Sequence, residues 1–246
     1  MGKTRLNYKE KFYRNYVTTH IVPRKGAITS DRFRINSFAY GKRFGKFLPN
    51  DKSSRIIDLG CGNGSVVWWL QNLSFTNVVG IDISLEQVEL ATKWGVKNIK
   101  QSNIKDFLRD KKKIYDVIFA LDVIEHFNKE EIVEILSACY DSLKENGVII
   151  IQVPNAESPF GGRIRYGDFT HEISFTMSSL SQLLKMVGFN CVEIYPRGPL
   201  LSGPRSLVRF TLWKIVELFY KVLLSAEIGQ AKKIVTQDLI ACAKKA

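Results

Sequence analysis

The segment from Arg55 to Gly64, RIIDLGCGNG, constrains the fold of this 246-residue chain more than any other segment. Two isoleucines and the acid Asp58 precede glycines at alternate positions, Gly60, Gly62 and Gly64, and the amphipathic stretch VVWWLQNL follows. Glycine lets the backbone turn sharply, and it lets a ligand approach the main chain where a Cβ atom would collide. The segment therefore predicts a strand, a tight ligand-binding turn and a helix.

A second acid, Asp82, ends the next apolar run, VVGID. An acid at the tip of the second strand of such a sheet is placed to accept hydrogen bonds from a ribose. The glycine spacing is G-x-G-x-G, whereas the nicotinamide dinucleotide fingerprint is G-x-G-x-x-G. An ordinary turn with incidental glycines is the alternative, and the combination of loop, preceding strand and Asp82 disfavours it.

Strand and helix patterns alternate along the middle of the chain. Strands are expected at 55–59, 78–82, 97–101, 115–120, 147–153 and 189–195. Helices are expected at 64–73, 85–94, 103–109, 130–144 and 177–187. This alternation predicts an α/β fold, a Rossmann-like doubly wound sheet of mostly parallel strands with helices on both faces.

The pattern D-x-G-x-G-x-G from Asp58 to Gly64, with Asp82 after the next strand, resembles motif I and its acidic partner in class I S-adenosylmethionine (SAM) methyltransferases. The resemblance implies a seven-stranded sheet with an antiparallel last strand beside the fifth, and residues 238–245 are the candidate. SAM carries no phosphate, so the loop needs room for its methionine part and an acid near its ammonium group. The residues expected to bind SAM here are Asp58, Gly60, Cys61, Gly62, Gly64, Asp82 and Ile83.

Two further segments resemble cofactor-binding motifs of this family. In QSNIKDF, Asn103 stands where the family often has an Asp that holds the adenine amino group, and its amide oxygen can accept the same bond. The backbone of the next residue, Ile104, is expected to meet the adenine ring nitrogens. The segment FALDVIEHF resembles the part of the family that lies beneath the methionine of SAM, which places Leu121 and Asp122 beside the sulfonium.

Methyl transfer from SAM is an in-line displacement, so the protein aligns the acceptor and removes a proton when the acceptor is a hydroxyl. A neutral imidazole suits that removal, and the three histidines are His20, His126 and His171. His171 lies in YGDFTHEISFT, beyond the fifth strand, at the edge where ligands of open α/β sheets bind. We expect His171 to be the base, oriented by Asp168, with His126 as the second candidate. A structural hydrogen bond is the alternative for both histidines.

The sequence shows no H-E-x-x-H motif and no clustered metal-ligand set, so no metal is expected. The four cysteines lack C-x-x-C spacing, and the N-terminus lacks the apolar core of a signal peptide. These features favour a cytoplasmic protein with reduced thiols.

The net charge of +12 is concentrated at the two ends of the chain. Residues 1–50 carry +10 and residues 205–246 carry +5, whereas the middle is near neutral. Basic flanks are typical of proteins that meet phospholipid headgroups, phosphorylated substrates or nucleic acid. A solvated surface is the alternative interpretation.

We expect a single methyltransferase domain over residues 1–246. Its predicted parts are a helical cap (1–50), a SAM-binding core (51–195), a helical insert (196–236) and the last strand (237–246). Charged residues interrupt the apolar helix of the insert, which argues against a membrane-spanning segment. Three roles stay open for this helix: contact with the inner face of the membrane, a lid over the site, or a homodimer interface.

The stretch PNAESPFGGRIRYGDFTHEISFT resembles bacterial methyltransferases encoded among surface-polysaccharide and glycolipid functions, and the core more distantly resembles quinone-pathway O-methyltransferases. The resemblance covers residues 13–200. The first hypothesis is O-methylation of a sugar, glycan or lipid-linked small molecule, with phosphorylated acceptors included. The alternatives are a quinone or small-phenol O-methyltransferase, an RNA methyltransferase and a catalytically silent SAM-binding subunit. Nucleic acid is disfavoured because ALDV replaces the Asn/Asp-Pro-Pro-aromatic motif of enzymes that methylate exocyclic base nitrogens.

Overall fold

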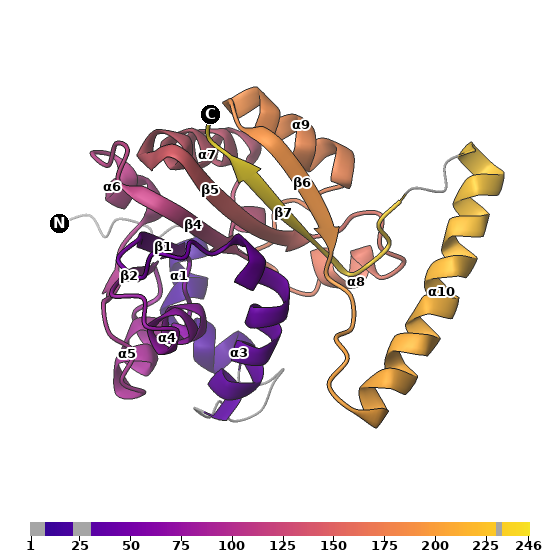
Figure 1. Cartoon of the computed structure of the whole chain (residues 1–246), viewed down its shortest axis with the longest axis horizontal. Helices are drawn as coiled ribbons and strands as arrows, with labels where there is room; N and C mark the ends of the chain where they lie inside the picture. Colours follow the sequence, from indigo (N-terminus) through magenta and orange to yellow (C-terminus); the bar gives the residue numbers. More distant parts are fainter. Residues whose placement is uncertain (1–7, 22–30, 230–232) are drawn as a thin grey trace.

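The computed structural model of the chain describes residues 8–21, 31–229 and 233–246. Within these residues one seven-stranded sheet has the order β3-β2-β1-β4-β5-β7-β6 (Figure 1). The strands are β1 (Arg55–Leu59), β2 (Asn77–Asp82), β3 (Ile99–Gln101), β4 (Tyr115–Leu121), β5 (Leu143–Pro154), β6 (Asn190–Pro196) and β7 (Asp238–Lys244).

Strands β1 to β5 pair in parallel, and β7 runs antiparallel between β5 and β6. The predicted doubly wound sheet, with an antiparallel last strand beside the fifth, is confirmed. The bounds differ most for β5, which begins at Leu143 rather than at residue 147, because Leu143 pairs with Tyr115 before an irregularity in the ladder. The polar run after Leu143 gives no sign of this pairing in the sequence.

Helices cover both faces of the sheet and create two cores. One face carries α6 (Ile104–Leu108), α7 (Lys129–Ser142) and α9 (Met177–Val187), and the other carries α3 (Asp31–Phe44), α4 (Ser65–Asn72) and α5 (Leu85–Lys93). Because successive strand residues point to opposite faces, Ile57 and Leu59 of β1 join the first core and Ile56 joins the second.

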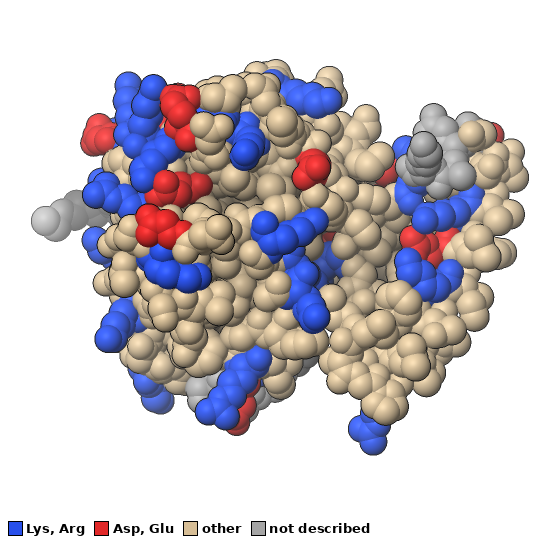
Figure 2. All heavy atoms as spheres, in the orientation of Figure 1, with Lys and Arg blue, Asp and Glu red and all other residues tan. Residues whose placement is uncertain are grey.

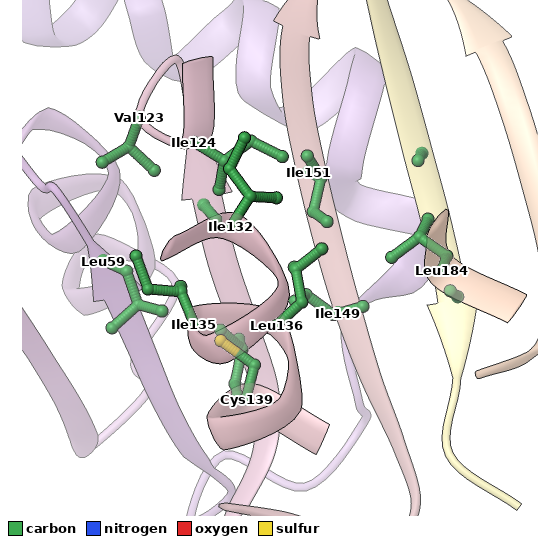
Figure 3. Close-up of a cluster of buried hydrophobic side chains, with 14 of the residues drawn as sticks. Leu59, Val123, Ile124, Ile132, Ile135, Leu136, Cys139, Ile149, Ile151 and Leu184 are labelled. Carbon is green, nitrogen blue, oxygen red and sulfur yellow. The ribbon is translucent and has the colours of Figure 1, made fainter. Parts of the chain in front are cut away.

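Helix α7 shows how the first core is built (Figure 3). Its inward residues recur at helical spacing and lie against the strand residues Leu59, Ile149 and Ile151. They are Ile132, Ile135, Leu136 and Cys139, all nearly or fully buried. Each buried aliphatic side chain stabilises the fold by about 1.5–3 kcal/mol, whereas the capping box of Asn128 and Glu131 contributes about 1 kcal/mol. Burial therefore dominates the stability of α7, and the cap sets where the helix begins.

The N-terminal region packs in two different places. The aromatic residues Phe33 and Phe44 of α3 are buried in the second core, and Phe44 contacts Phe119 of β4 edge to face. The short elements α1 (Tyr8–Arg14) and η1 (Val17–Ile21) pack elsewhere. Tyr8 of α1 bonds to Glu172 in the loop after α8 (Gly161–Arg165), and η1 bonds to the start of α5. The remaining short helices are η2 (Gly45–Phe47) and η3 (Ile124–His126).

The predicted insert forms the long helix α10 (Pro204–Ile228), which stands beside the β6 edge of the sheet (Figure 1). None of the side chains described from 204 to 227 is buried. Among the described residues, no helix combines the length and the apolar character that crossing a membrane requires.

Candidate active site

The glycine turn between β1 and α4 lies at the carboxyl end of the sheet. Gly60, Gly62 and Gly64 have φ angles of +66°, +53° and +76°, in the left-handed region that disfavours a side chain. A Cβ atom on Gly60 would lie 2.5 Å from Cγ2 of Val123. Glycine at this position is therefore required both by the backbone conformation and by the space available.

Asp82, at the end of β2, holds this turn in place. Its Oδ2 accepts a hydrogen bond from the Gly62 amide at 2.8 Å, and its Oδ1 accepts one from the Ser84 amide at 2.8 Å. Burial raises the pKa of Asp82, and these backbone donors lower it. Each carboxylate oxygen has a second lone pair, so Asp82 can support the turn and still accept a ribose hydroxyl.

The residues around the turn fit a cationic ligand. Asp58 is buried, and both burial and the charge of Asp82 raise the pKa of Asp58 well above its usual range. A nearby cation would favour its ionised form, and SAM carries a sulfonium and an ammonium group. The side-chain oxygens of Ser84 and Gln87 are buried without a hydrogen-bond partner, and Gln87 lies beside Gly62. These unpaired polar atoms are consistent with a polar ligand at the turn.

The other predicted cofactor residues follow the neighbouring strands. Ile83 and Asn103 follow β2 and β3, and Asn103 caps α6 because its Oδ1 accepts from the Lys105 amide at 2.8 Å. Asp122 follows Leu121, the last residue of β4, and has a left-handed φ of +54°. Its Oδ2 accepts from Nε2 of Gln152 at 2.7 Å. A non-glycine residue in this conformation, at the ligand edge of a sheet, indicates a functional constraint.

The remaining members of the predicted cofactor set, Cys61 and Ile104, are both buried. Cys61 donates its amide to the Ile81 carbonyl at 2.9 Å, which joins the turn to β2. Ile104 opens α6 directly after Asn103. The structure thus brings the predicted cofactor residues of β1, β2, β3 and β4 to one edge of the sheet.

His126 and His171, predicted as alternative bases, lie together. Their ring centroids are 4.7 Å apart in an edge-to-face arrangement. His126 ends η3 after β4 and is buried, whereas His171 lies in the loop before α9 and is partly exposed. The structure therefore makes them one pair rather than two separate candidates.

The hydrogen-bond partners of the two rings indicate where their protons lie. Thr170 donates its hydroxyl to Oδ1 of Asp168 at 2.6 Å, so its oxygen accepts from Nδ1 of His126 at 2.8 Å. Nδ1 of His171 lies 3.1 Å from the Ile164 carbonyl, which can only accept. We assign a proton to Nδ1 of each ring on this basis, which leaves both Nε2 atoms with a lone pair.

Burial keeps the two imidazoles neutral near pH 7. Burial, with a smaller contribution from the nearby His171, lowers the pKa of His126 to about 4. Burial also lowers the pKa of His171, against the opposing charge of Asp168. Asp168 was expected to orient His171. In the structure, the Asp168 carboxylate is linked to His126 through the hydroxyl of Thr170.

Glu125 is a site residue that the sequence analysis missed. Its carboxylate, His126 and His171 offer ligand atoms that all lie within 4.8 Å of one another. Glu125 is 1% exposed, and its Oε2 has no hydrogen-bond partner. The cluster is not visible in the sequence because β5 and α8 separate Glu125 and His126 from His171 along the chain.

The N-terminal segment covers this cluster. The Tyr16 hydroxyl donates to Oδ2 of Asp168 at 2.6 Å, and the Tyr13 ring lies 6.2 Å from the His126 ring. At the other end of the segment, the Val17 amide donates to Oε2 of Glu86, in the first turn of α5, at 2.9 Å. Residues 13–17 therefore reach from the histidine pair to the segment that follows Asp82. Their aromatic spacing is visible in the sequence, but their position over the site is not.

Comparisons with known proteins agree with this geometry. Residues 31–194 match the family described as a methyltransferase domain. The chain is 37% identical over 114 residues to a ubiquinone biosynthesis O-methyltransferase of Rickettsia conorii, an alignment that covers 44% of this chain and 38% of that protein. The chain thus spans less than half the length of the curated relatives it matches.

Two solved structures share the fold. A SAM-dependent methyltransferase from Archaeoglobus fulgidus superposes with a TM-score of 0.64 at 23% identity, covering 87% of this chain and 97% of that chain. A Haemonchus contortus phosphoethanolamine N-methyltransferase, in complex with phosphomonomethylethanolamine and S-adenosylhomocysteine, gives 0.60 at 17% identity, with 95% and 60% covered.

The fold and the turn define a Rossmann-like SAM-binding protein. The family match shows that the chain belongs to the methyltransferase-domain family, and SAM is its cofactor. Asp58, Asp82 and Asp122 lie at the edge of the sheet where the sequence predicts the cofactor site.

Gly60→Ala tests the steric requirement of the turn, with Gly95→Ala as a matched control. Gly95 has a similar φ of +76°, but nothing lies within 4 Å of the position of its Cβ. Both variants meet left-handed strain of about 1–2 kcal/mol, and Gly60→Ala also meets overpacking of about 1–3 kcal/mol. Chemical denaturation should therefore show a larger loss of stability for Gly60→Ala. Equal losses would contradict the proposed contact with Val123.

Asp82→Ala should weaken SAM binding at least tenfold in calorimetry, because the turn loses the acceptor for the Gly62 amide and the ribose loses its partner. Asp106→Ala is the control, since Asp106 is exposed on α6 and pairs with Arg109 away from the turn. Unchanged SAM affinity in Asp82→Ala would show that the cofactor is bound elsewhere.

Proposed function

We propose that this protein transfers the methyl group of SAM to a hydroxyl group of a small acceptor that is linked to a lipid. The observation that carries the proposal is the pair His126 and His171, at the cofactor edge of the sheet, with both Nε2 lone pairs free. A hydroxyl acceptor must lose a proton to form a methyl ether, and this pair is built to assist that loss.

The reaction balances with the groups at this edge. The acceptor oxygen attacks the methyl carbon, the bond from that carbon to sulfur breaks, and S-adenosylhomocysteine leaves as a neutral thioether. The hydroxyl proton is lost at the histidine pair. Assistance with a proton transfer contributes about 10²–10⁴-fold to a rate.

A quinone-pathway phenol is the first acceptor class. The relatives named as ubiquinone biosynthesis O-methyltransferases support it, at 35–37% identity over less than half of their lengths. A phenol ionises far more readily than a sugar hydroxyl, because a phenolic pKa is about 10. The neutral imidazoles of the site are therefore better matched to a phenol.

A lipid-linked sugar or glycan is the second acceptor class, and a hollow beside α10 favours it. The hollow has a volume of about 340 Å³ and lies between α10 and the sheet edge. Basic side chains of Lys42, Arg43 and Lys46 line it, together with the rings of Phe210 and Trp213. Such a lining suits the phosphate and the first part of the hydrocarbon chain of an anionic lipid carrier.

We further propose that α10 binds the inner surface of the cytoplasmic membrane. The surface of α10 in Figure 2 is mostly uncharged, whereas a solvent-exposed helix normally carries charged or polar residues on its outer face. Its exposed apolar residues are Leu207, Val208, Leu212, Ile215, Leu218, Phe219, Val222 and Leu223. Arg205 and Arg209 lie near the N-terminal end of α10, so the helix combines apolar area with attraction to anionic lipid headgroups.

The acceptor class can be tested by a labelled-methyl assay with prenylated phenol, lipid-linked glycan and RNA fractions in parallel. We expect label in a lipid-extractable phenol or glycan and none in RNA. His171→Ala should lower the rate about 10²–10⁴-fold, while Met186→Ala, exposed on α9, should leave it unchanged. Label in RNA, or a full rate for His171→Ala on the identified acceptor, would contradict the proposal.

The membrane role can be tested by replacing Leu212, Ile215 and Phe219 with serine and measuring sedimentation with anionic vesicles. We expect the bound fraction to fall several-fold, because the apolar area of α10 is lost. Ile35→Ser, an exposed apolar position on α3, is the control. If the triple variant still binds vesicles but changes the oligomeric state in light scattering, α10 is a subunit interface instead.

A further inference from the structure

We propose that Glu125, His126 and His171 bind one divalent metal ion, which holds the acceptor hydroxyl during methyl transfer. The positions of the three side chains support the metal site, whereas the role of the metal in the reaction rests on the proposed function. Nothing in the sequence pattern or the comparisons assigns a metal to this chain.

The donor set is that of a catalytic metal centre. Two imidazole nitrogens and one carboxylate oxygen leave coordination positions open for water or a substrate. The lone pairs of both Nε2 atoms are available because Nδ1 of each ring is engaged in a hydrogen bond. Imidazole and carboxylate donors suit Zn²⁺, Fe²⁺ and Mn²⁺.

Glu125 supplies the independent sign that a cation belongs here. Its side chain is almost fully buried, and Oε2 has no hydrogen-bond partner. No lysine or arginine of the described residues forms an ion pair with it. A buried carboxyl oxygen without a hydrogen-bond partner is costly, and a metal ion bound to that oxygen would offset the cost.

Neighbouring residues form hydrogen bonds with the proposed ligands, as is common around metal sites. Asp168 orients Thr170, and Thr170 orients His126. The Ile164 carbonyl orients His171. The Glu125 carbonyl also accepts the Glu172 amide at 2.8 Å, which ties the loop that carries His171 to η3.

The distances fit after a small movement. Two ligands at about 2.1 Å from a tetrahedral metal ion lie about 3.4 Å apart. The present ligand atoms lie within 4.8 Å of one another, so closure requires a shift of at most about 1.4 Å. His171 can make this shift because it lies in a loop and is partly exposed. The same exposure provides an entry path for the ion.

The metal changes how the proton is lost. A bound ion would take one ring nitrogen of each histidine as a ligand, so neither imidazole would accept the proton. The ion would instead lower the pKa of the acceptor hydroxyl, as a metal lowers the pKa of bound water from about 16 to about 7. The proton passes to solvent, and the oxygen attacks the methyl carbon of SAM. The products are the methyl ether, S-adenosylhomocysteine and one proton.

The site can be tested by titrating the metal-free full chain with Mn²⁺ and with Zn²⁺ in a calorimeter. We expect one ion per chain and at least tenfold weaker binding for Glu125→Gln. Glu130→Gln is the matched control, because Glu130 is exposed in the first turn of α7 and outside the site. Absence of binding, or equal affinity in Glu125→Gln and the unmodified chain, would overturn the metal site.

Thermal unfolding provides a second readout that does not depend on activity. The metal should raise the melting temperature of the unmodified chain and of Glu130→Gln, and leave that of Glu125→Gln unchanged. Without metal, Glu125→Gln should melt close to the unmodified chain, because glutamine has nearly the same size and shape as glutamate. A much lower melting temperature would show that Glu125 is a structural residue rather than a ligand.

Activity assays with a chelator distinguish the metal's role from the proposed hydroxyl methylation. Methyl transfer should be lost with a chelator and regained with Mn²⁺ or Zn²⁺. Full activity in the chelator would overturn the metal's role and leave hydroxyl methylation by direct proton transfer to a histidine. Intact metal binding with no methylation of any hydroxyl acceptor would instead contradict the proposed function.

Discussion

The parallel pairing of β1 with β2 and β4 is the constraint on which the rest of the molecule depends. Asp58 pairs in register with Gly80 and Phe119, so the three strands end at nearly the same level. Their carboxyl ends then deliver the glycine turn, Asp82 and Asp122 to one edge. The two hydrogen bonds of Asp82 lock the turn there, and the cofactor position follows from this arrangement.

The cluster of Glu125, His126 and His171 is formed by segments that the sheet does not itself place. Glu125 and His126 follow β4, whereas His171 comes from the loop after α8 and is held there by hydrogen bonds to its neighbours. The result is a pair of acids, Asp58 and Asp82, at the edge of the sheet that also carries the cluster of Glu125, His126 and His171.

Helix α10 packs differently from the other helices of the fold. Helices α4 and α7 bury their apolar faces against the sheet, whereas α10 presents its apolar residues outward. A helix in water derives most of its stability from burial of an apolar face, so α10 is expected to gain stability from the surface that it binds. The basic residues near α10 favour a surface that is negatively charged.

The order of strands and helices, the turn RIIDLGCGNG and the acids Asp58 and Asp82 were predictable from sequence, because short-range periodicity and glycine spacing encode them. The early start of β5 was not, because its pairing with β4 depends on a neighbouring strand. The cluster of Glu125, His126 and His171 was also unpredictable, since two separate loops must meet to form it. Sequence alone determined the sheet and the cofactor turn through local patterns. The tertiary structure decided which side chains form the cluster of Glu125, His126 and His171, because contacts between distant segments depend on how the loops fold back over the sheet.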